Sequence, residues 1–337
     1  MATTTQTIEH RTPPPYILTP GEDETAIIYP DPTWSHTTIN YFKDASQPPP
    51  TAQNSTLSTH DLHVAARSEA SPNVAPTPVR IRNIRGHEAD YSLATQGFTI
   101  ARLDSAMHHA SSRSGDWHDD AKLKQIYFPE LTALLRRETG AEYVYQYEWH
   151  VRSQTLEASL EQDSGHAVDI AGPVRRVHID ETPAAARREY EYYVRPDDPG
   201  NEHLRGRDFA VVNVWKPLKT VRRDPLCLCD QRTVRDEDLQ PGKITVLDIG
   251  EIENFAVRAP ETGEEGRHEF VYVRGQEPEE VLVFRIFDSR LDGGVHGERG
   301  VEGGKRIHGV AHTSFVDPGT EREGPRESIE VRSFCVF

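Results

Sequence analysis

The stretch VRRVHIDETP, residues 174–183, decides how the rest of this chain is interpreted. His178 and Asp180 are separated by one residue, so on a β-strand their side chains leave the same face. An imidazole and a carboxylate directed at one point are two of the three ligands of a 2-His-1-carboxylate site, which binds Fe(II) and leaves coordination positions open. The strand is expected to end here, because Thr182 suits a helix N-cap and Pro183 suits the first helical position.

A third ligand is needed, because a His-x-Asp pair alone is weak evidence in a chain with 16 histidines and 54 acidic residues. The run GVAHTSFVDP at residues 309–318 places His312 in a short strand-like segment. His308 is the local alternative, and His296 is a weaker one because it lies among Gly, Asp and Glu. Without a further feature, a solvated polar strand would also explain the pair.

The further feature is the pair Arg326 and Ser328 in the run PRESIEVR at residues 325–332. At positions i and i+2 of a strand, a guanidinium and a hydroxyl share a face. The planar guanidinium can bind both oxygens of a carboxylate, so the pair predicts an anchor for a carboxylate ligand. Arg332 is the alternative anchor if the register of this strand differs.

Five runs of the chain together resemble one family of enzymes. The runs HIDETPAAARR, VVNVWKPLKTVRRDPLCLCDQRTV, VLVFRIFDS, AHTSFVDP and PRESIEVR are similar to the fungal gibberellin-desaturase-like and cephalosporin-methoxylase-like Fe(II)/2-oxoglutarate-dependent oxygenases. The resemblance extends from residue 78 to residue 337. It implies that Fe(II) is bound by His178, Asp180 and His312, with no further catalytic side chain. It also implies that 2-oxoglutarate is bound by Arg326, Ser328 and Asn213, with O2 as the oxidant.

The activity that the resemblance implies is hydroxylation or desaturation of a small-molecule intermediate of fungal specialised metabolism. Oxidative ring expansion or epimerisation at the same site remains open. Two non-oxygenase alternatives are a jelly-roll protein that only binds a metal and a zinc hydrolase on the same ligands. The Arg326–Ser328 pair argues against both, because a plain metal site needs no carboxylate anchor.

Short alternating runs predict eight or more strands from residue 142 onward. We expect them at 142–152, 209–218, 226–230, 244–248, 253–258, 269–273, 279–287 and 328–337. Many short strands separated by polar turns predict a mainly β fold, a jelly roll or double-stranded β-helix. Flanking helices are expected, such as residues 122–139, which have helical apolar spacing and end at Gly140. Residues 1–77, with a possible strand at 24–29, form an expected N-terminal extension that wraps the oxygenase domain at 78–337.

Two predicted strands carry the candidate substrate contacts. In EYVYQYEWHVR, alternation places Trp149 on the same face as the tyrosines, and His150 and Arg152 on the other face, which is expected to line the site. In FAVVNVWKPL, Trp215 shares a face with Asn213 and either contacts the ligands or packs in the core. Lys216, like Arg152 and Arg175, is expected either to contact an acidic substrate or to face solvent.

Composition narrows the class of partner. The net charge is −16 and the pI is near 5.5, which disfavours nucleic acid and anionic membrane surfaces, since both require clustered Lys and Arg. No apolar run reaches the roughly 20 residues of a membrane helix, and the N-terminal residues show no secretory h-region. The three cysteines favour a reducing compartment, with Cys227 and Cys229 as buried thiols. We expect a cytoplasmic enzyme with a small-molecule substrate, and a homodimer remains open.

Overall fold

The computed structural model describes residues 32–43, 74–110, 114–161, 172–246, 250–292 and 309–337. The expected strand at 24–29, His296 and His308 lie outside these residues. So does most of the expected N-terminal extension.

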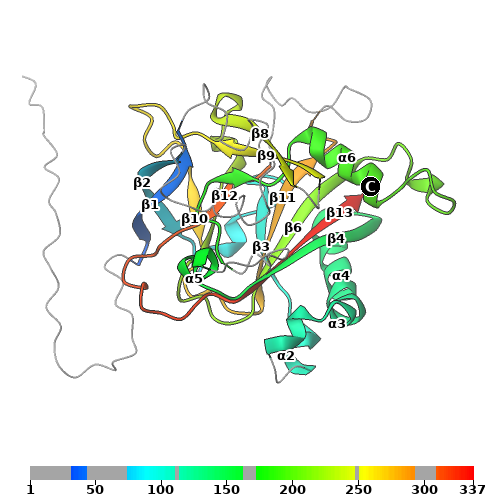
Figure 1. The fold of residues 1–337 in the computed structure, drawn as a ribbon, viewed down its shortest axis with the longest axis horizontal. Coiled ribbons are helices and arrows are strands. Elements are labelled where there is room, and N and C mark those ends of the chain that lie inside the picture. The colour runs from blue at the N-terminus through cyan, green and yellow to red at the C-terminus, as the bar shows by residue number, and fades with distance from the viewer. Residues whose placement is uncertain (1–31, 44–73, 111–113, 162–171, 247–249, 293–308) are drawn as a thin grey trace, which may run out of the picture.

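Two β-sheets face each other and form the jelly roll that the sequence predicts, so the fold is mainly β (Figure 1). The eight-stranded sheet has the order β1-β2-β10-β7-β12-β5-β9-β8, and the five-stranded sheet has the order β3-β11-β6-β13-β4. The strands are β1 (Trp34–Phe42), β2 (Val74–Asn83), β3 (Phe98–Arg102), β4 (Tyr143–Arg152), β5 (His178–Ile179), β6 (Phe209–Pro217), β7 (Leu226–Cys229), β8 (Leu239–Val246), β9 (Gly250–Val257), β10 (Phe270–Tyr272), β11 (Glu280–Asp288), β12 (His312–Ser314) and β13 (Ser328–Val336). The predicted domain boundary at residue 78 falls inside β2, which pairs with β1 along its length.

Helices flank the sheets, as expected. They are α2 (Ala106–Ala110), α3 (Asp120–Lys122), α4 (Phe128–Thr139), α5 (Leu156–Glu161) and α6 (Pro183–Tyr193), with short 3-10 turns at 88–90, 114–118, 202–204, 231–233 and 236–238. The predicted helix at 122–139 is confirmed, but a π-helical turn, Leu123–Tyr127, precedes α4. Pro129 explains this turn, because proline lacks the N–H that a regular helix would use.

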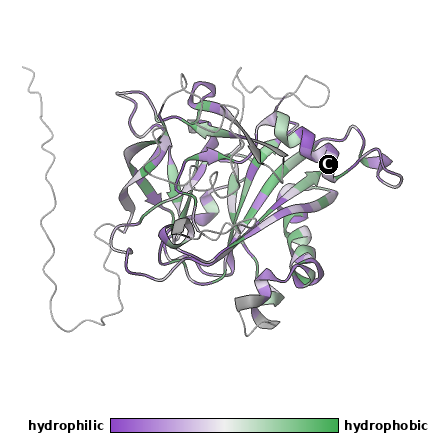
Figure 2. Cartoon of the chain, viewed as in Figure 1, coloured by the Kyte–Doolittle hydropathy of each residue, from purple (hydrophilic) through white to green (hydrophobic). Residues whose placement is uncertain are grey.

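The main core lies between the two sheets, and a second core lies between the five-stranded sheet and α4. Figure 2 shows the hydrophobic residues gathered in the strands and the hydrophilic ones on the peripheral loops. All nine residues of β6 are buried, because one face of the strand packs in the main core and the other face packs in the second core. On β6, Val211 and Trp215 face the space between the sheets, whereas Val212 and Val214 face the helices.

The prediction that Trp149 shares a face with the tyrosines of β4 is wrong. The pairing of β13 with β4 shifts between Arg332 and Ser333, so β4 carries one extra residue, Tyr147. Such a bulge reverses the alternation beyond it. Tyr147 therefore packs between the sheets, while Trp149 packs against Phe128 on the helix side.

One further strand and one loop differ from expectation in detail. The strand expected at 244–248 is the end of β8, which begins at Leu239 and tolerates Pro241 because it lies at the edge of its sheet. The polar loop expected at 153–172 contains the helix α5. Cys227 and Cys229 are buried free thiols, as predicted.

Candidate metal centre

His178, Asp180 and His312 come together at the facing ends of two short strands. His178 on β5 pairs directly with His312 on β12 in an antiparallel ladder. Their Nε2 atoms lie 3.2 and 3.6 Å from Oδ1 of Asp180, and the three ligand atoms lie within 4.8 Å of one another. One nitrogen from each imidazole and one carboxylate oxygen therefore converge on a single point, as a facial triad requires.

Backbone carbonyls fix the orientation of both imidazole rings. Nδ1 of His178 lies 2.7 Å from the carbonyl of Arg176, and Nδ1 of His312 lies 3.0 Å from the carbonyl of Val310. A carbonyl can only accept, so each Nδ1 carries a proton, and in the neutral ring this leaves the lone pair of Nε2 for a metal. Burial lowers the pKa of His312, and the neighbouring His178 lowers it further, so the ring is neutral near pH 7.

The second oxygen of Asp180 is held by two donors from the facing sheet. Asn213 Nδ2 donates to Oδ2 at 2.6 Å, and Arg332 Nη2 lies 3.2 Å from the same atom. Burial raises the pKa of this carboxyl, but Arg332 and the two imidazoles outweigh burial and hold the pKa well below its usual range. Asp180 is therefore ionised, with Oδ1 left facing the histidines.

Arg332 links Asp180 to two glutamates. Its Nη1 lies 2.6 Å from Glu148 and 3.2 Å from Glu181, and Glu181 also accepts a hydrogen bond from the hydroxyl of Tyr147. Burial raises the pKa of Glu181 to about 8 despite the nearby guanidinium. Burial also raises the pKa of Glu148, but Arg332 outweighs it and brings this pKa to about 2.

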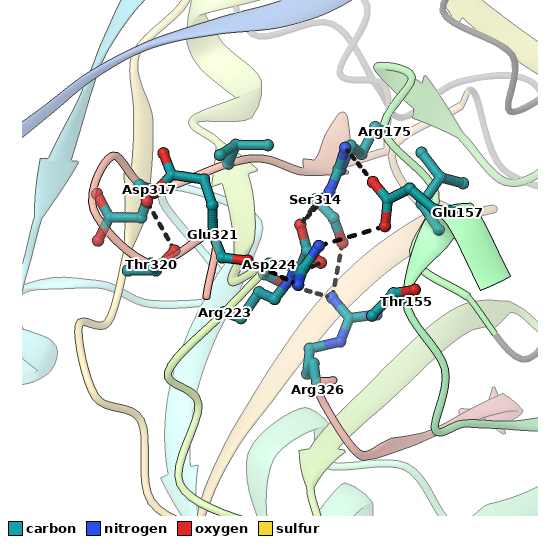
Figure 3. Close-up of polar contacts among 12 residues, drawn as sticks. Thr155, Glu157, Arg175, Arg223, Asp224, Ser314, Asp317, Thr320, Glu321 and Arg326 are labelled. Atoms are coloured by element: carbon teal, nitrogen blue, oxygen red, sulfur yellow. Dashed lines mark hydrogen bonds and ion pairs between the residues drawn. The ribbon is translucent and has the colours of Figure 1, made fainter. Parts of the chain in front are cut away.

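Arg326 lies two residues before β13 and is buried, and its hydrogen-bond partners are neutral groups (Figure 3). Its Nη1 donates to the carbonyl of Asp224 at 2.8 Å and to Oγ of Ser314 at 2.6 Å. Its guanidinium also stands 5.2 Å from the ring centre of Trp215. Burial and the neighbouring Arg152 lower the pKa of Arg326 to about 10, which leaves it charged at neutral pH.

Unpaired polar atoms mark the space for a further ligand. The hydroxyl of Ser328 and the side-chain oxygen of Asn213 are buried and have no hydrogen-bond partner among the described residues. Buried polar atoms are nearly always satisfied, so the Ser328 hydroxyl calls for an acceptor, whereas the Asn213 oxygen can only accept and calls for a donor such as water. A dicarboxylate bound between the His–Asp–His cluster and Arg326 fits this arrangement. The two imidazoles and the carboxylate of the cluster are suitable iron ligands, and the guanidinium is suited to bind a carboxylate.

The other predicted residues take different places. Asn213 donates its amide to Asp180 and to Glu330, at 2.6 and 2.8 Å. Trp215 lies in the core beneath Arg326. Lys216 is fully buried on the opposite face of β6, where it donates to the carbonyls of Leu103 and Pro278. The expectation that it faces solvent is wrong, and its position separates it from the cluster.

The two candidates on β4 lie on the inner face. Arg152 pairs in register with Ser328, and its Nη1 donates to the carbonyl of Gly172 at 3.2 Å. His150 pairs in register with Glu330, and its Nε2 lies 3.2 Å from Glu148. Arg175, also a candidate substrate contact, is instead ion-paired with Asp224.

Sequence reasoning did not assign Glu330, Glu148 or Glu181 to the site, and it considered Arg332 only as an alternative carboxylate anchor. The signal was present on β13, because Ser328, Glu330 and Arg332 alternate and therefore share one face. Extending the Arg326–Ser328 pattern along the strand would have found the arginine and one glutamate.

Known proteins resemble this chain along most of its length. A family model described as an oxidoreductase/YMDC permease-like domain matches residues 39–336. The alpha-ketoglutarate-dependent dioxygenase phiK of a fungal species is 32% identical, covering 86% of this chain and 93% of that protein. The gibberellin cluster GA4 desaturase of Gibberella fujikuroi is 25% identical, covering 77% of this chain and 86% of that protein.

A solved structure shares the fold. The iron and alpha-ketoglutarate-dependent endoperoxidase NvfI superposes with a TM-score of 0.67 at 23% identity, over 91% of this chain and 99% of NvfI. Among the described residues, none of the helices has the length and apolar character needed to span a membrane.

Proposed function

This chain belongs to the fungal Fe(II)/2-oxoglutarate-dependent oxygenases, and we propose that His178, Asp180 and His312 are its iron ligands. We further propose that Arg326 and Ser328 bind the distal carboxylate of 2-oxoglutarate. The enzyme is an oxidoreductase that uses Fe(II), 2-oxoglutarate and O2 on a small molecule of fungal specialised metabolism. When bound, iron and 2-oxoglutarate supply the oxidation of a C–H bond by O2, with succinate and CO2 as co-products.

The roles of the side chains follow from their contacts. The carbonyls of Arg176 and Val310 keep both Nε2 lone pairs directed at the metal position. Asn213 and Arg332 hold one oxygen of Asp180, which leaves the other oxygen as a single ligand atom. Arg326, buried without a carboxylate partner among the described residues, supplies the positive charge for the co-substrate. The unsatisfied hydroxyl of Ser328 supplies a donor beside it.

The observation that carries the proposal is the combination of a His–Asp–His cluster with a separate anchor for a carboxylate. A site that only binds a metal would need the cluster but not the anchor. A zinc hydrolase would likewise leave the anchor without a use.

The test is anaerobic addition of Fe(II) and then 2-oxoglutarate to the purified protein, with the weak visible charge-transfer band of chelated 2-oxoglutarate as the readout. We expect the band in the native protein and in His87→Ala, which changes an exposed histidine. His178→Ala and His312→Ala should lose both iron binding and the band. Folded native protein that binds iron without forming the band would favour a metal-binding protein without oxygenase activity.

The type of oxidation is read from the product. Hydroxylation adds about 16 mass units and desaturation removes about 2. Ring expansion and epimerisation are distinguished by the structure of the product.

We also propose a cytoplasmic location, supported by three buried free cysteines, which suit a reducing compartment. A homodimer is supported by the four exposed tyrosines on β4 and α6, which line one surface groove: Tyr143, Tyr145, Tyr192 and Tyr193. Light scattering of the purified protein at several concentrations would distinguish a dimer from a monomer.

A further inference from the structure

Asp224, in the loop between β6 and β7, has an unusual backbone. Its φ is +50°, and among the described residues only Arg195 is another non-glycine residue with positive φ. The next residue is Pro225, whose ring favours extended backbone at the position before it. A side chain with positive φ before proline is unfavourable, so it persists only when its surroundings hold it there.

Two arginines hold Asp224 in this conformation (Figure 3). Arg175 donates to Oδ1 from Nε and Nη2 at 3.2 and 2.8 Å, and Arg223 donates to Oδ2 from Nε at 3.3 Å. Asp224 is 1% exposed, so these charge-assisted hydrogen bonds form away from water.

The consequence lies in the backbone carbonyl of Asp224. It accepts the hydrogen bond from Nη1 of Arg326, the same nitrogen that donates to Ser314. Ser314 is fixed in β12, two residues past His312, so it is attached to the metal side of the site. Asp224 supplies the second contact, and its carbonyl reaches Arg326 from a backbone turned to positive φ.

We propose that Asp224 is a positioning residue for the co-substrate, acting through Arg326. Its carboxylate, locked by Arg175 and Arg223, keeps the strained turn in place, and the turn aims the guanidinium at the distal carboxylate of 2-oxoglutarate. This inference rests on the proposed function, which assigns that carboxylate to Arg326.

Charge alone would act in the opposite direction. Removing the carboxylate of Asp224 leaves Arg175 and Arg223 without their buried counter-charge and makes the region more positive. A dianion would then be attracted more strongly, so a purely electrostatic role predicts tighter binding of 2-oxoglutarate. A positioning role predicts weaker binding, and the two roles therefore differ in sign.

The experiment measures equilibrium binding to the Fe(II)-loaded protein under anaerobic conditions, without turnover. Each variant is titrated with 2-oxoglutarate and with 2-oxobutyrate, which keeps the metal-chelating end but lacks the distal carboxylate. We expect Asp224→Ala to raise the Kd for 2-oxoglutarate about tenfold and Asp224→Asn about threefold, because asparagine tolerates positive φ and still accepts from arginine. Asp224→Gly still allows positive φ but removes the carboxylate that pairs with Arg175 and Arg223, so its increase in Kd should lie between those of the other two variants. The Kd for 2-oxobutyrate should stay within twofold in all three.

The matched control is Glu157→Gln on α5. Glu157 lies 3.6 Å from Arg175 and 3.2 Å from Arg223, yet it makes no contact with Arg326 and its side chain is 58% exposed. Its Kd values should stay within twofold of the native protein. If Asp224→Ala does not fold, the asparagine and glycine variants carry the test, with Fe(II) binding and the thermal midpoint as checks of the fold.

Two outcomes overturn the inference. Unchanged or tighter 2-oxoglutarate binding in the Asp224 variants would exclude a positioning role, and equal losses for both 2-oxo acids would mean general damage to the site. Arg326→Met separates the inference from the proposed function. If it leaves 2-oxoglutarate binding unchanged, the proposed anchor itself is wrong. If Arg326→Met weakens binding but the Asp224 variants do not, Arg326 binds the co-substrate and Asp224 has no positioning role.

Discussion

Arg326 and Arg332 lie six residues apart, beside and within the same strand, and both are largely buried. Arg332 contacts three carboxyl groups, those of Asp180, Glu148 and Glu181. Arg326 instead donates to a backbone carbonyl and a hydroxyl and stands beside the Trp215 ring. Removing a guanidinium from water is costly unless opposite charge compensates it. The protein therefore provides ion-pair partners for Arg332, whereas the proposed co-substrate would provide one for Arg326.

The pKa shifts of the two arginines reflect this difference. Burial lowers the pKa of both groups, but the carboxylates around Arg332 outweigh burial and raise its pKa well above the usual value. For Arg326, burial and Arg152 prevail and lower the pKa to about 10. A bound dicarboxylate would stabilise the charged form of Arg326, in the way that Asp180 and the glutamates stabilise Arg332.

The largest effect is expected for Arg332→Met. It leaves three clustered carboxyl groups without their cation, and breaking a buried ion pair in this way costs about 3–5 kcal/mol of unfolding free energy. Urea unfolding of the metal-free protein at pH 7 measures this loss. A loss below about 1 kcal/mol would mean that Arg332 is not the structural arginine, and the comparison would fail.

Arg326→Met should behave in the opposite way. Without ligand, the unfolding free energy should stay within about 1 kcal/mol of the native value, because replacing a poorly compensated buried charge by an apolar side chain is often neutral. The Kd for 2-oxoglutarate should rise about 30- to 150-fold, since charged hydrogen bonds contribute about 2–3 kcal/mol. Isothermal titration gives the affinity. If Arg332→Met, rather than Arg326→Met, raises this Kd while iron still binds, the two roles are reversed.

Ser328→Ala tests whether the hydroxyl near Arg326 contributes to binding of the co-substrate. Its hydroxyl has no partner among the described residues, so removing it should not destabilise the ligand-free protein. Loss of one hydrogen bond to the co-substrate carboxylate, about 1.5 kcal/mol, should raise the KM for 2-oxoglutarate about tenfold. Steady-state succinate release measures this effect, with Ser333→Ala as the control on the helix-facing side of the same strand. An unchanged KM would remove Ser328 from the anchor.

The smallest expected effect is a pH dependence of the unfolding free energy that comes from Glu148, an ion-pair partner of Arg332. Ion pairing with Arg332 brings the pKa of Glu148 to about 2, from an unfolded value of 4.5, against the effect of burial. A depressed pKa gives stability that is present above pH 4.5 and is lost as the pH falls toward 2. Because Glu148 is 39% exposed, solvent screening limits the contribution to about 1 kcal/mol. Glu148→Gln should therefore be less stable than the native protein at pH 6, and this difference should vanish near pH 2 in acid titrations of unfolding. A difference that persists at pH 2 would assign the effect to packing.

The sequence predicted the jelly roll because most of its strands carry their own signal. β6, β11 and β13 are short apolar runs between polar turns, and each was expected within one or two residues of its observed bounds. The His-x-Asp spacing likewise identified two side chains that do converge with His312.

What could not be predicted depends on partners that are distant in the chain. The bulge at Tyr147 exists only because β4 pairs with β13, so local alternation assigned Trp149 to the wrong face. Lys216 lies on a strand with both faces buried, where alternation carries no information about which side meets the site. The turn at Asp224 is held by arginines from two other segments, and nothing in the run RRDP indicates a positive φ.

β13 lies between β6 and β4, although these two strands are made long before it. A ribosome adding ~5–20 residues per second needs roughly 10 to 35 s to progress from the end of β4 to the start of β13. During that interval β4 has no neighbour in its sheet, and the carboxylates around Asp180 lack their arginine. The proposed metal site therefore gains Arg332 only when residues 328–336 enter the sheet. In the order of synthesis, His178 and Asp180 are made early and His312 much later, and the strand that supplies Arg332 to Asp180 arrives last.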